Sequence, residues 1–233
     1  MSTPRKLIGL IVIGLLLGLG FYLFNSFRSS AARSPYVWTY LNDPAENQKY
    51  VLPAGLRCGA APFIFPTTGM VGYLWDDSFK VGHRHQGIDI FAGTDVDVTE
   101  VISASAGYLT RLPEWKSSLI VRVPDDPLRP GRQIWLYYTH MADANGNSFI
   151  SAEFPAGTEE QYIEAGKLLG RQGNYSGDPN NPVGVHLHFS IVLDDGLGRF
   201  KNELDINNTL DPSPYLGLAL NANNNPDQIP TCP

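Results

Sequence analysis

The chain is short of positive charge and of cysteine, and each shortage argues against a class of partner or site. The chain has 17 Lys and Arg residues and 23 Asp and Glu residues, which gives a net charge of −6 over 233 residues. No basic stripe is available to meet phosphates, so the composition argues against nucleic acid as a partner. Only two cysteines are present, and neither is near a histidine in the sequence, which argues against a cysteine-rich structural zinc site. No internal repeat is visible.

The N-terminus, in contrast, is rich in apolar residues. Leu7 to Phe24 contains no charged residue, and a helix of this length nearly spans a hydrocarbon core of ~30 Å. Arg5 and Lys6 precede it and favour a cytoplasmic N-terminus. Residues 1–28 are therefore predicted to be a membrane anchor, a single transmembrane helix, or a cleaved signal segment. The apolar region of a signal peptide is usually shorter, about 7–15 residues, which favours the anchor.

Both alternatives place the rest of the chain on the extracytoplasmic side, either held at the cell membrane or secreted if the segment is cleaved. In an oxidising compartment, Cys58 and Cys232 could form a disulfide that joins the two ends of the domain. The alternative is a pair of free thiols, which would be open to oxidation outside the cell. The sequence favours the disulfide.

The remainder divides into a linker or N-terminal extension at 29–60, a folded domain at 61–216 and an irregular C-terminal tail at 217–233. Within the domain, short apolar runs alternate with Gly, Pro, Asp and Asn, which is typical of strands and turns. The predicted fold class is mainly β, an antiparallel sheet or sandwich. Only residues 158–166 hint at a helix. The predicted strand segments are 63–74, 86–93, 99–112, 118–124, 132–141, 165–173 and 185–193.

Four of the five histidines fall in two short segments, "HRHQGIDI" and "VHLHFSI". In a strand, side chains two residues apart point to the same face. His186 and His188 would then project together, with Leu187 and Phe189 packing on the opposite face. A motif as short as H-x-H is common, so taken alone this motif favours an ordinary pair of surface or core histidines.

The first segment strengthens the case for a metal site. His85 and Asp89 share a face if the segment is extended, and Ile88 and Ile90 point the other way. Two imidazoles and a carboxylate suit Zn²⁺, and three protein ligands leave a fourth tetrahedral position for water, as in catalytic zinc sites. His83 is two residues from His85 and could compete as a ligand, but a position on the rim is favoured.

His140, the fifth histidine, ends the predicted strand "YYTHM". A lone histidine there is usually a hydrogen-bonded spectator. The order H-x-G-x-D, Y-x-H and G-x-H-L-H-F, however, resembles that of the LytM/lysostaphin-type zinc metallopeptidases, family M23. These are β-sheet enzymes that cut peptide cross-links of bacterial peptidoglycan. The resemblance covers about residues 62–196.

The resemblance implies a LytM-type fold and a zinc-dependent endopeptidase acting on cell-wall peptidoglycan through a metal-bound water. It implies that His85, Asp89 and His188 hold one Zn²⁺ per chain, and that His140 and His186 line the site as catalytic residues. One of these two would act as base and the other would stabilise the oxyanion. The sequence does not divide the two roles between them.

The chain also departs from the family pattern. The loop at 174–184 is longer than usual, and Ser190 stands where the family often has Glu. These differences leave the metal ligands intact and the substrate preference open. Two alternatives remain: a non-catalytic LytM-fold module that binds wall peptides or activates an amidase, and a purely structural zinc domain. The expected partners are peptidoglycan peptides and the membrane.

Overall fold

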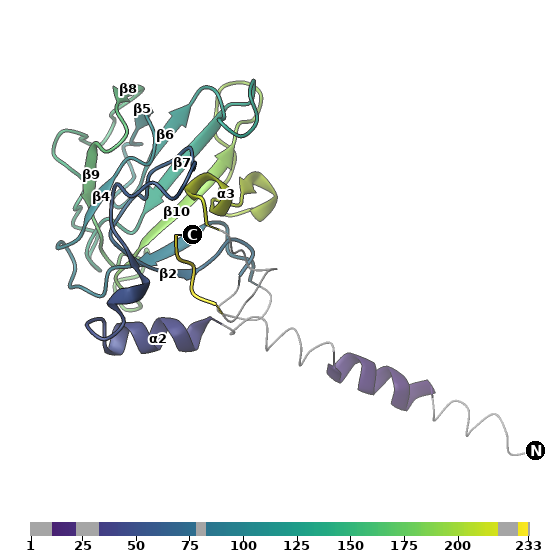
Figure 1. Ribbon diagram of the computed structural model, residues 1–233. Coiled ribbons are helices and arrows are strands. Elements are labelled where there is room, and N and C mark those ends of the chain that lie inside the picture. Colours follow the sequence, from purple (N-terminus) through teal and green to yellow (C-terminus); the bar gives the residue numbers. More distant parts are fainter. Residues whose placement is uncertain (1–10, 22–32, 78–82, 219–227, 233) are drawn as a thin grey trace, which may run out of the picture.

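The computed structural model describes residues 11–21, 33–77, 83–218 and 228–232. Residues 11–21 form a helix whose large apolar side chains are exposed (Figure 1). The span expected from Leu7 to Phe24 extends beyond the described residues at both ends. Among the helices that the structure does describe, none combines the length and the apolar character needed to cross a membrane.

The rest is mainly antiparallel β-sheet, as the sequence predicts (Figure 1). A nine-stranded sheet has the order β1-β2-β3-β10-β7-β6-β5-β8, and β11 also pairs with β10. A second, two-stranded sheet consists of β4 and β9. The strands are β1 (Val51–Leu52), β2 (Gly69–Tyr73), β3 (Ile88–Phe91), β4 (Glu100–Ile102), β5 (Gly107–Thr110), β6 (Leu119–Val123), β7 (Ile134–Thr139), β8 (Gln161–Ile163), β9 (Leu168–Arg171), β10 (Leu187–Leu193) and β11 (Thr209–Leu210).

The weak prediction of a helix at 158–166 is wrong. Strand β8 occupies the middle of this segment and pairs with β5. Tyr162 and Ile163, an aromatic and a β-branched residue, favour a strand. The helices are elsewhere: α2 (Ser34–Asn42), the 3₁₀ helices η1 (Gln48–Tyr50) and η2 (Ile206–Asn208), and α3 (Ser213–Leu216).

The helix α2 covers one face of β2 and β3. It has a proline in its first turn, where the missing N–H is harmless. Val37 and Tyr40 are buried against Met70 of β2 and Phe91 of β3. The hydroxyl of Tyr40 also donates a hydrogen bond of 2.8 Å to the carbonyl of Ala92. The N-terminal extension is thereby attached to the edge of the sheet.

Strand alternation separates the core from the polar face. In β10, Leu187, Phe189 and Ile191 are fully buried in the main core. His188 and Ser190 alternate with them, which places both on the opposite face. The central strand β10 pairs with β3 on one side and with β7 on the other. Polar residues from three neighbouring strands can therefore meet on one face of the sheet.

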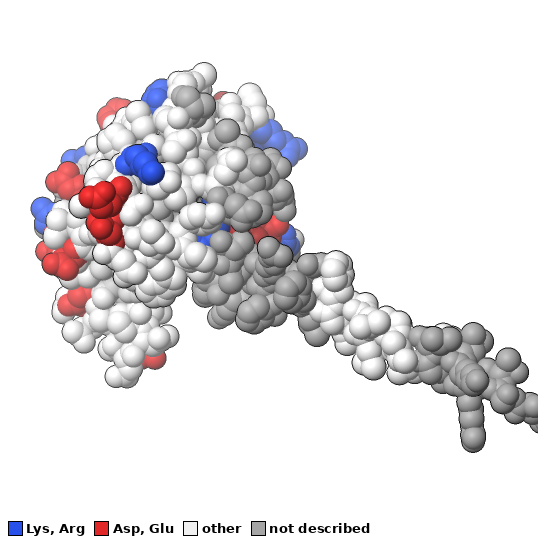
Figure 2. All heavy atoms as spheres, turned by 60° about the horizontal axis from the view of Figure 1, so that its bottom comes forward, with Lys and Arg blue, Asp and Glu red and all other residues white. Residues whose placement is uncertain are grey.

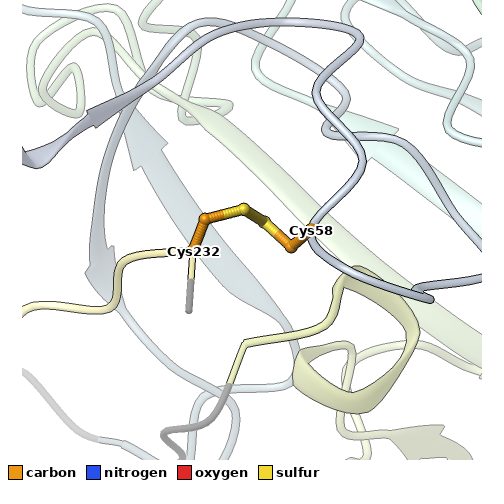
Figure 3. Close-up of a disulfide and its surroundings, with 2 residues drawn as sticks. All are labelled: Cys58 and Cys232. Atoms are coloured by element: carbon orange, nitrogen blue, oxygen red, sulfur yellow. A yellow bond between two sulfur atoms is a disulfide. The ribbon is translucent and has the colours of Figure 1, made fainter.

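A disulfide joins Cys58 to Cys232, as expected (Figure 3). The two residues are 174 positions apart in the sequence, and their Cα atoms are 5.2 Å apart. Cys58 precedes the main strands, and Cys232 belongs to the last described segment of the chain. The bridge therefore attaches the C-terminal segment to the N-terminal part of the domain.

Candidate metal centre

Strand register places two of the candidate ligands side by side. His188 of β10 is directly opposite Asp89 of β3. Gly87, in the H-x-G-x-D motif, permits this close pairing, because a Cβ at this position would collide with the carbonyl oxygen of Phe189. His85 precedes β3, and its backbone N–H donates a hydrogen bond of 2.8 Å to the carbonyl of Asp77. The motif glycine is therefore a packing requirement of this site.

The three candidate ligands converge on one point. His85 Nε2 is 3.0 Å from Asp89 Oδ1 and 3.0 Å from His188 Nδ1. Asp89 Oδ1 is 2.9 Å from His188 Nδ1. All three side chains are buried. These atoms are close enough together to share one metal ion.

The remaining ring nitrogens orient the donors. His85 Nδ1 donates to the carbonyl of Leu74 at 3.0 Å, and His188 Nε2 donates to Glu203 Oε1 at 2.9 Å. Each imidazole then points its other nitrogen at the shared point, where a bound metal ion would take the place of a proton on His188. Two imidazole nitrogens and one carboxylate oxygen form a donor set that fits Zn²⁺.

Two further histidines stand beside this cluster. His186 Nε2 is 3.5 Å from Asp89 Oδ1, and the rings of His140 and His186 are 4.5 Å apart between centroids. Both donate Nδ1–H to a backbone carbonyl at 2.6 Å, His186 to Gly184 and His140 to Tyr175. Each therefore has Nε2 available as a proton acceptor, so the structure brings together all five residues singled out from the sequence.

The backbone at His140 is unusual. It adopts a left-handed conformation with φ of 72°, which is uncommon for a residue other than glycine and is often found at functional sites. His140 directly follows β7, and Gly173 packs tightly against the backbone carbonyls of His140 and Ala142. A neighbouring loop therefore supports this histidine in its strained position.

His83 does not join the three candidate ligands. It lines the cleft, and its ring centroid is 6.3 Å from that of His85. Within the described part of the chain, the group that could hold a metal ion consists of His85, Asp89 and His188. His83 therefore lines the cleft without belonging to the group of candidate ligands.

Electrostatics around the cluster favour a cation. Burial alone would raise the pKa of Asp89, but His85 and His186 hold it well below its ordinary value. Burial alone would lower the pKa of His188, yet Asp89 and Glu203 raise it to about 10. Two carboxylates, the buried Asp89 and the partly buried Glu203, thus flank one imidazole and attract positive charge, which a divalent cation would supply in place of a proton.

The environment of His140 lowers the pKa of its ring, whereas that of His188 raises it. Burial, reinforced by the nearby His186 and His188, lowers the pKa of His140 to about 3. This imidazole is therefore neutral at physiological pH. A neutral imidazole with an available Nε2 can accept a proton or a hydrogen bond.

The cluster lies at the base of a cleft with a volume of about 560 Å³. One wall comes from α2, through Val37, Trp38 and Leu41. Trp38 is 64% exposed, so an aromatic ring stands at the mouth of the cleft. In Figure 2, which brings the α2 side forward, most of the visible acidic side chains lie along the left of the view, with Lys and Arg side chains among them.

Sequence reasoning missed several contributors to this site. Glu203 bonds to a candidate ligand from a loop after β10, and nothing near it in the sequence signals that contact. The carbonyls of Leu74 and Tyr175 fix two of the rings. The wall formed by α2 comes from a stretch predicted only as a linker or extension.

No protein-family model matches the chain, and no curated protein matches it. Solved structures do. Csd3 of Helicobacter pylori is 19% identical, with a TM-score of 0.38, over 65% of this chain and 32% of that one. A Ruminococcus gnavus protein described as a glycyl-glycine endopeptidase LytM is 24% identical, with a TM-score of 0.36, over 55% of this chain and 44% of that one. A Pseudomonas aeruginosa protein described as a peptidase M23 is 17% identical, with a TM-score of 0.41, over 76% of this chain and 60% of that one.

The chain is similar to M23 and LytM-type peptidases of known structure. It spans less than two thirds of the length of each of these three chains. The likeness is remote at these identities and TM-scores, so the function is inferred from the site's own residues.

Proposed function

We propose that this protein is a zinc-dependent endopeptidase that hydrolyses peptide bonds of bacterial cell-wall peptidoglycan. The observation that carries the proposal is the convergence of His85, Asp89 and His188 within 3.0 Å of one another at the base of an open cleft. Three protein ligands with an accessible fourth position are typical of catalytic zinc, whereas structural zinc is usually closed by four.

The zinc ion would supply Lewis acidity and lower the pKa of a water molecule toward ~7. The chain's own residues supply proton transfer and orientation. His140 and His186 present Nε2 toward the same space, because both donate Nδ1–H to backbone carbonyls. One accepts a proton from water at Nε2 and delivers it to the leaving amine, and the other, in its doubly protonated form, donates a hydrogen bond from Nε2 where negative charge develops.

The substrate would enter between α2 and the loop that carries Val183 and Gly184, since both line the cleft above the cluster. We place this domain on the extracytoplasmic side, held by the apolar segment Leu7 to Phe24 or released if that segment is cleaved. The disulfide between Cys58 and Cys232 supports an oxidising compartment. An extracytoplasmic location and an oxidising compartment both agree with a substrate in the cell wall.

The leading alternative is a non-catalytic module of similar fold that binds wall peptides or activates an amidase. The buried and mutually oriented ligand set favours catalysis over this alternative. The test is digestion of purified sacculi by the full-length protein, with and without a chelator, followed by analysis of the released peptides. We expect the protein to release soluble fragments with new amino termini, and we expect no such release when a chelator is present. Binding to sacculi without cleavage, in protein loaded with zinc, would support the module instead.

A further inference from the structure

Glu203 is distinctive among the contacts of the site histidines. The second ring nitrogens of His85, His140 and His186 all meet backbone carbonyls. That of His188 instead meets a carboxylate, Glu203 Oε1, at 2.9 Å. A carboxylate is the stronger acceptor, because a hydrogen bond to an ionised group is about twice as strong as a neutral one.

The carboxylate itself is held by two groups on one face of β10. Ser190 Oγ donates to the same Oε1 at 3.1 Å, and Ser190 lies two residues after His188 on the strand. The side chain of Glu203 is only 15% exposed. A single carboxylate oxygen is thus shared between His188 and Ser190.

The loop carrying Glu203 is also attached to the metal-binding segment. Gln86, next to His85, donates its side-chain amide to the carbonyl of Leu204 at 3.0 Å. The backbone N–H of Leu204 is bonded to the side chain of Asn202 at 3.1 Å. The position of Glu203 is therefore fixed from both sides, by β10 and by the segment that precedes β3.

We propose that Glu203 is the positioning residue for the zinc ligand His188. By accepting the Nε2–H, it fixes the ring rotation and keeps the electron pair of Nδ1 directed at His85 and Asp89. The inference rests on the proposed zinc site. Partners of this kind typically contribute 10–100-fold to metal affinity.

The test uses full-length protein and compares zinc affinity, by competition with a chelating dye, among Glu203→Ala, Glu203→Gln and Ser190→Ala. Glu114→Ala removes an exposed carboxylate away from the site and serves as the matched control. We expect Glu203→Ala to weaken zinc binding by 10–100-fold. Glu203→Gln keeps an acceptor oxygen without the charge and should fall between Glu203→Ala and wild type. Ser190→Ala should have a smaller effect, and the control none.

A spectroscopic measurement separates positioning from a general structural role. In the zinc-loaded wild type, nitrogen-15 NMR of the histidine rings should show a slowly exchanging Nε2–H on His188. This signal should shift and exchange rapidly in Glu203→Ala, while the Nδ1–H of His85 is unchanged. Thermal melting of the metal-free variants checks that they fold. If Glu203→Ala does not fold, the isosteric Glu203→Gln decides by the same measurements.

Zinc affinity within threefold of wild type in Glu203→Ala, or equal to wild type in Glu203→Gln if it alone folds, would overturn the inference. So would an unchanged His188 signal. If the wild type binds zinc and digests sacculi while the Glu203 variants match it, the inference fails and the proposed function stands. If the wild type binds no zinc, both fail.

Discussion

The buried ion pair between Arg33 and Asp77 connects the N-terminal extension to the candidate metal centre. The two side chains are 2% and 6% exposed, and Arg33 Nε is 2.7 Å from Asp77 Oδ2. Asp77 Oδ2 also accepts the backbone N–H of Leu74, whose carbonyl in turn fixes the ring of His85. Arg33 Nη1 donates to the carbonyl of Gln228 at 2.7 Å. Removing Arg33 therefore perturbs both the stability and the site.

The loss of stability expected from removing Arg33 can be estimated from the distance between the two charges. Two unit charges 2.7 Å apart attract by about 6 kcal/mol at an effective dielectric constant of ~20. Desolvation offsets part of this, and removing one partner of a buried pair costs about 3–5 kcal/mol. We therefore expect Arg33→Met to lower the free energy of unfolding by about 3–5 kcal/mol and the melting temperature by roughly 6–20 °C.

The stability lost in Arg33→Met should depend on pH. Burial raises the pKa of Asp77, although the Leu74 amide and Arg33 act in the opposite direction. Without Arg33, this pKa rises further above its unfolded value, so the folded variant binds a proton more tightly than the unfolded chain does. The stability lost in Arg33→Met is therefore largest at neutral pH and is partly regained as the pH falls.

The assay is urea unfolding of the metal-free protein at two pH values, followed by tryptophan fluorescence. The single variant Asp77→Asn and the double variant Arg33→Met/Asp77→Asn complete a double-mutant cycle, and the double variant should be more stable than Arg33→Met alone. The reasoning is refuted if Arg33→Met unfolds within 1 kcal/mol of wild type, or if the effects of the two substitutions add.

Three further predictions concern other parts of the fold. Replacing Cys58 and Cys232 with Ser should lower the free energy of unfolding by up to about 5 kcal/mol, because the disulfide closes a loop of 174 residues; the same stability in reduced and oxidised protein would contradict this. Gly87→Ala should lower it by about 1–3 kcal/mol and weaken zinc binding, because the added Cβ meets the backbone of β10; unchanged unfolding and zinc titrations would count against the packing argument. His140→Ala and His186→Ala should each lower kcat/KM for wall peptides by ~10²–10⁴ while metal analysis finds the zinc content unchanged; loss of zinc would instead make either residue a ligand.

The candidate metal ligands could be named from the sequence because strand alternation exposes them. In "VHLHFS", apolar residues alternate with His186, His188 and Ser190, and the structure shows the same alternation of core and polar face. The pairing of β10 with β3, which places His188 opposite Asp89, could not be predicted from strand alternation. That register depends on long-range contacts, so only the family resemblance could suggest it.

Other contributors lack a local signal. Glu203 lies 15 residues after His188, beyond a turn-rich loop, and no periodicity connects the two. The helix α2 did have a faint signal, with a proline in its first turn and apolar Val37, Tyr40 and Leu41 at helical spacing. Its aromatic and β-branched residues have strand propensity, and this obscured the helix. Packing on Met70 and Phe91 decides the outcome.

The most direct test of the central claim compares wild type with Asp89→Ala in two measurements, zinc content and digestion of purified sacculi. The account predicts about one zinc per wild-type chain, cleavage that stops with chelator and returns when zinc is restored, and neither zinc nor cleavage in a folded Asp89→Ala protein. Cleavage that persists in chelator, or full activity in Asp89→Ala, would contradict it.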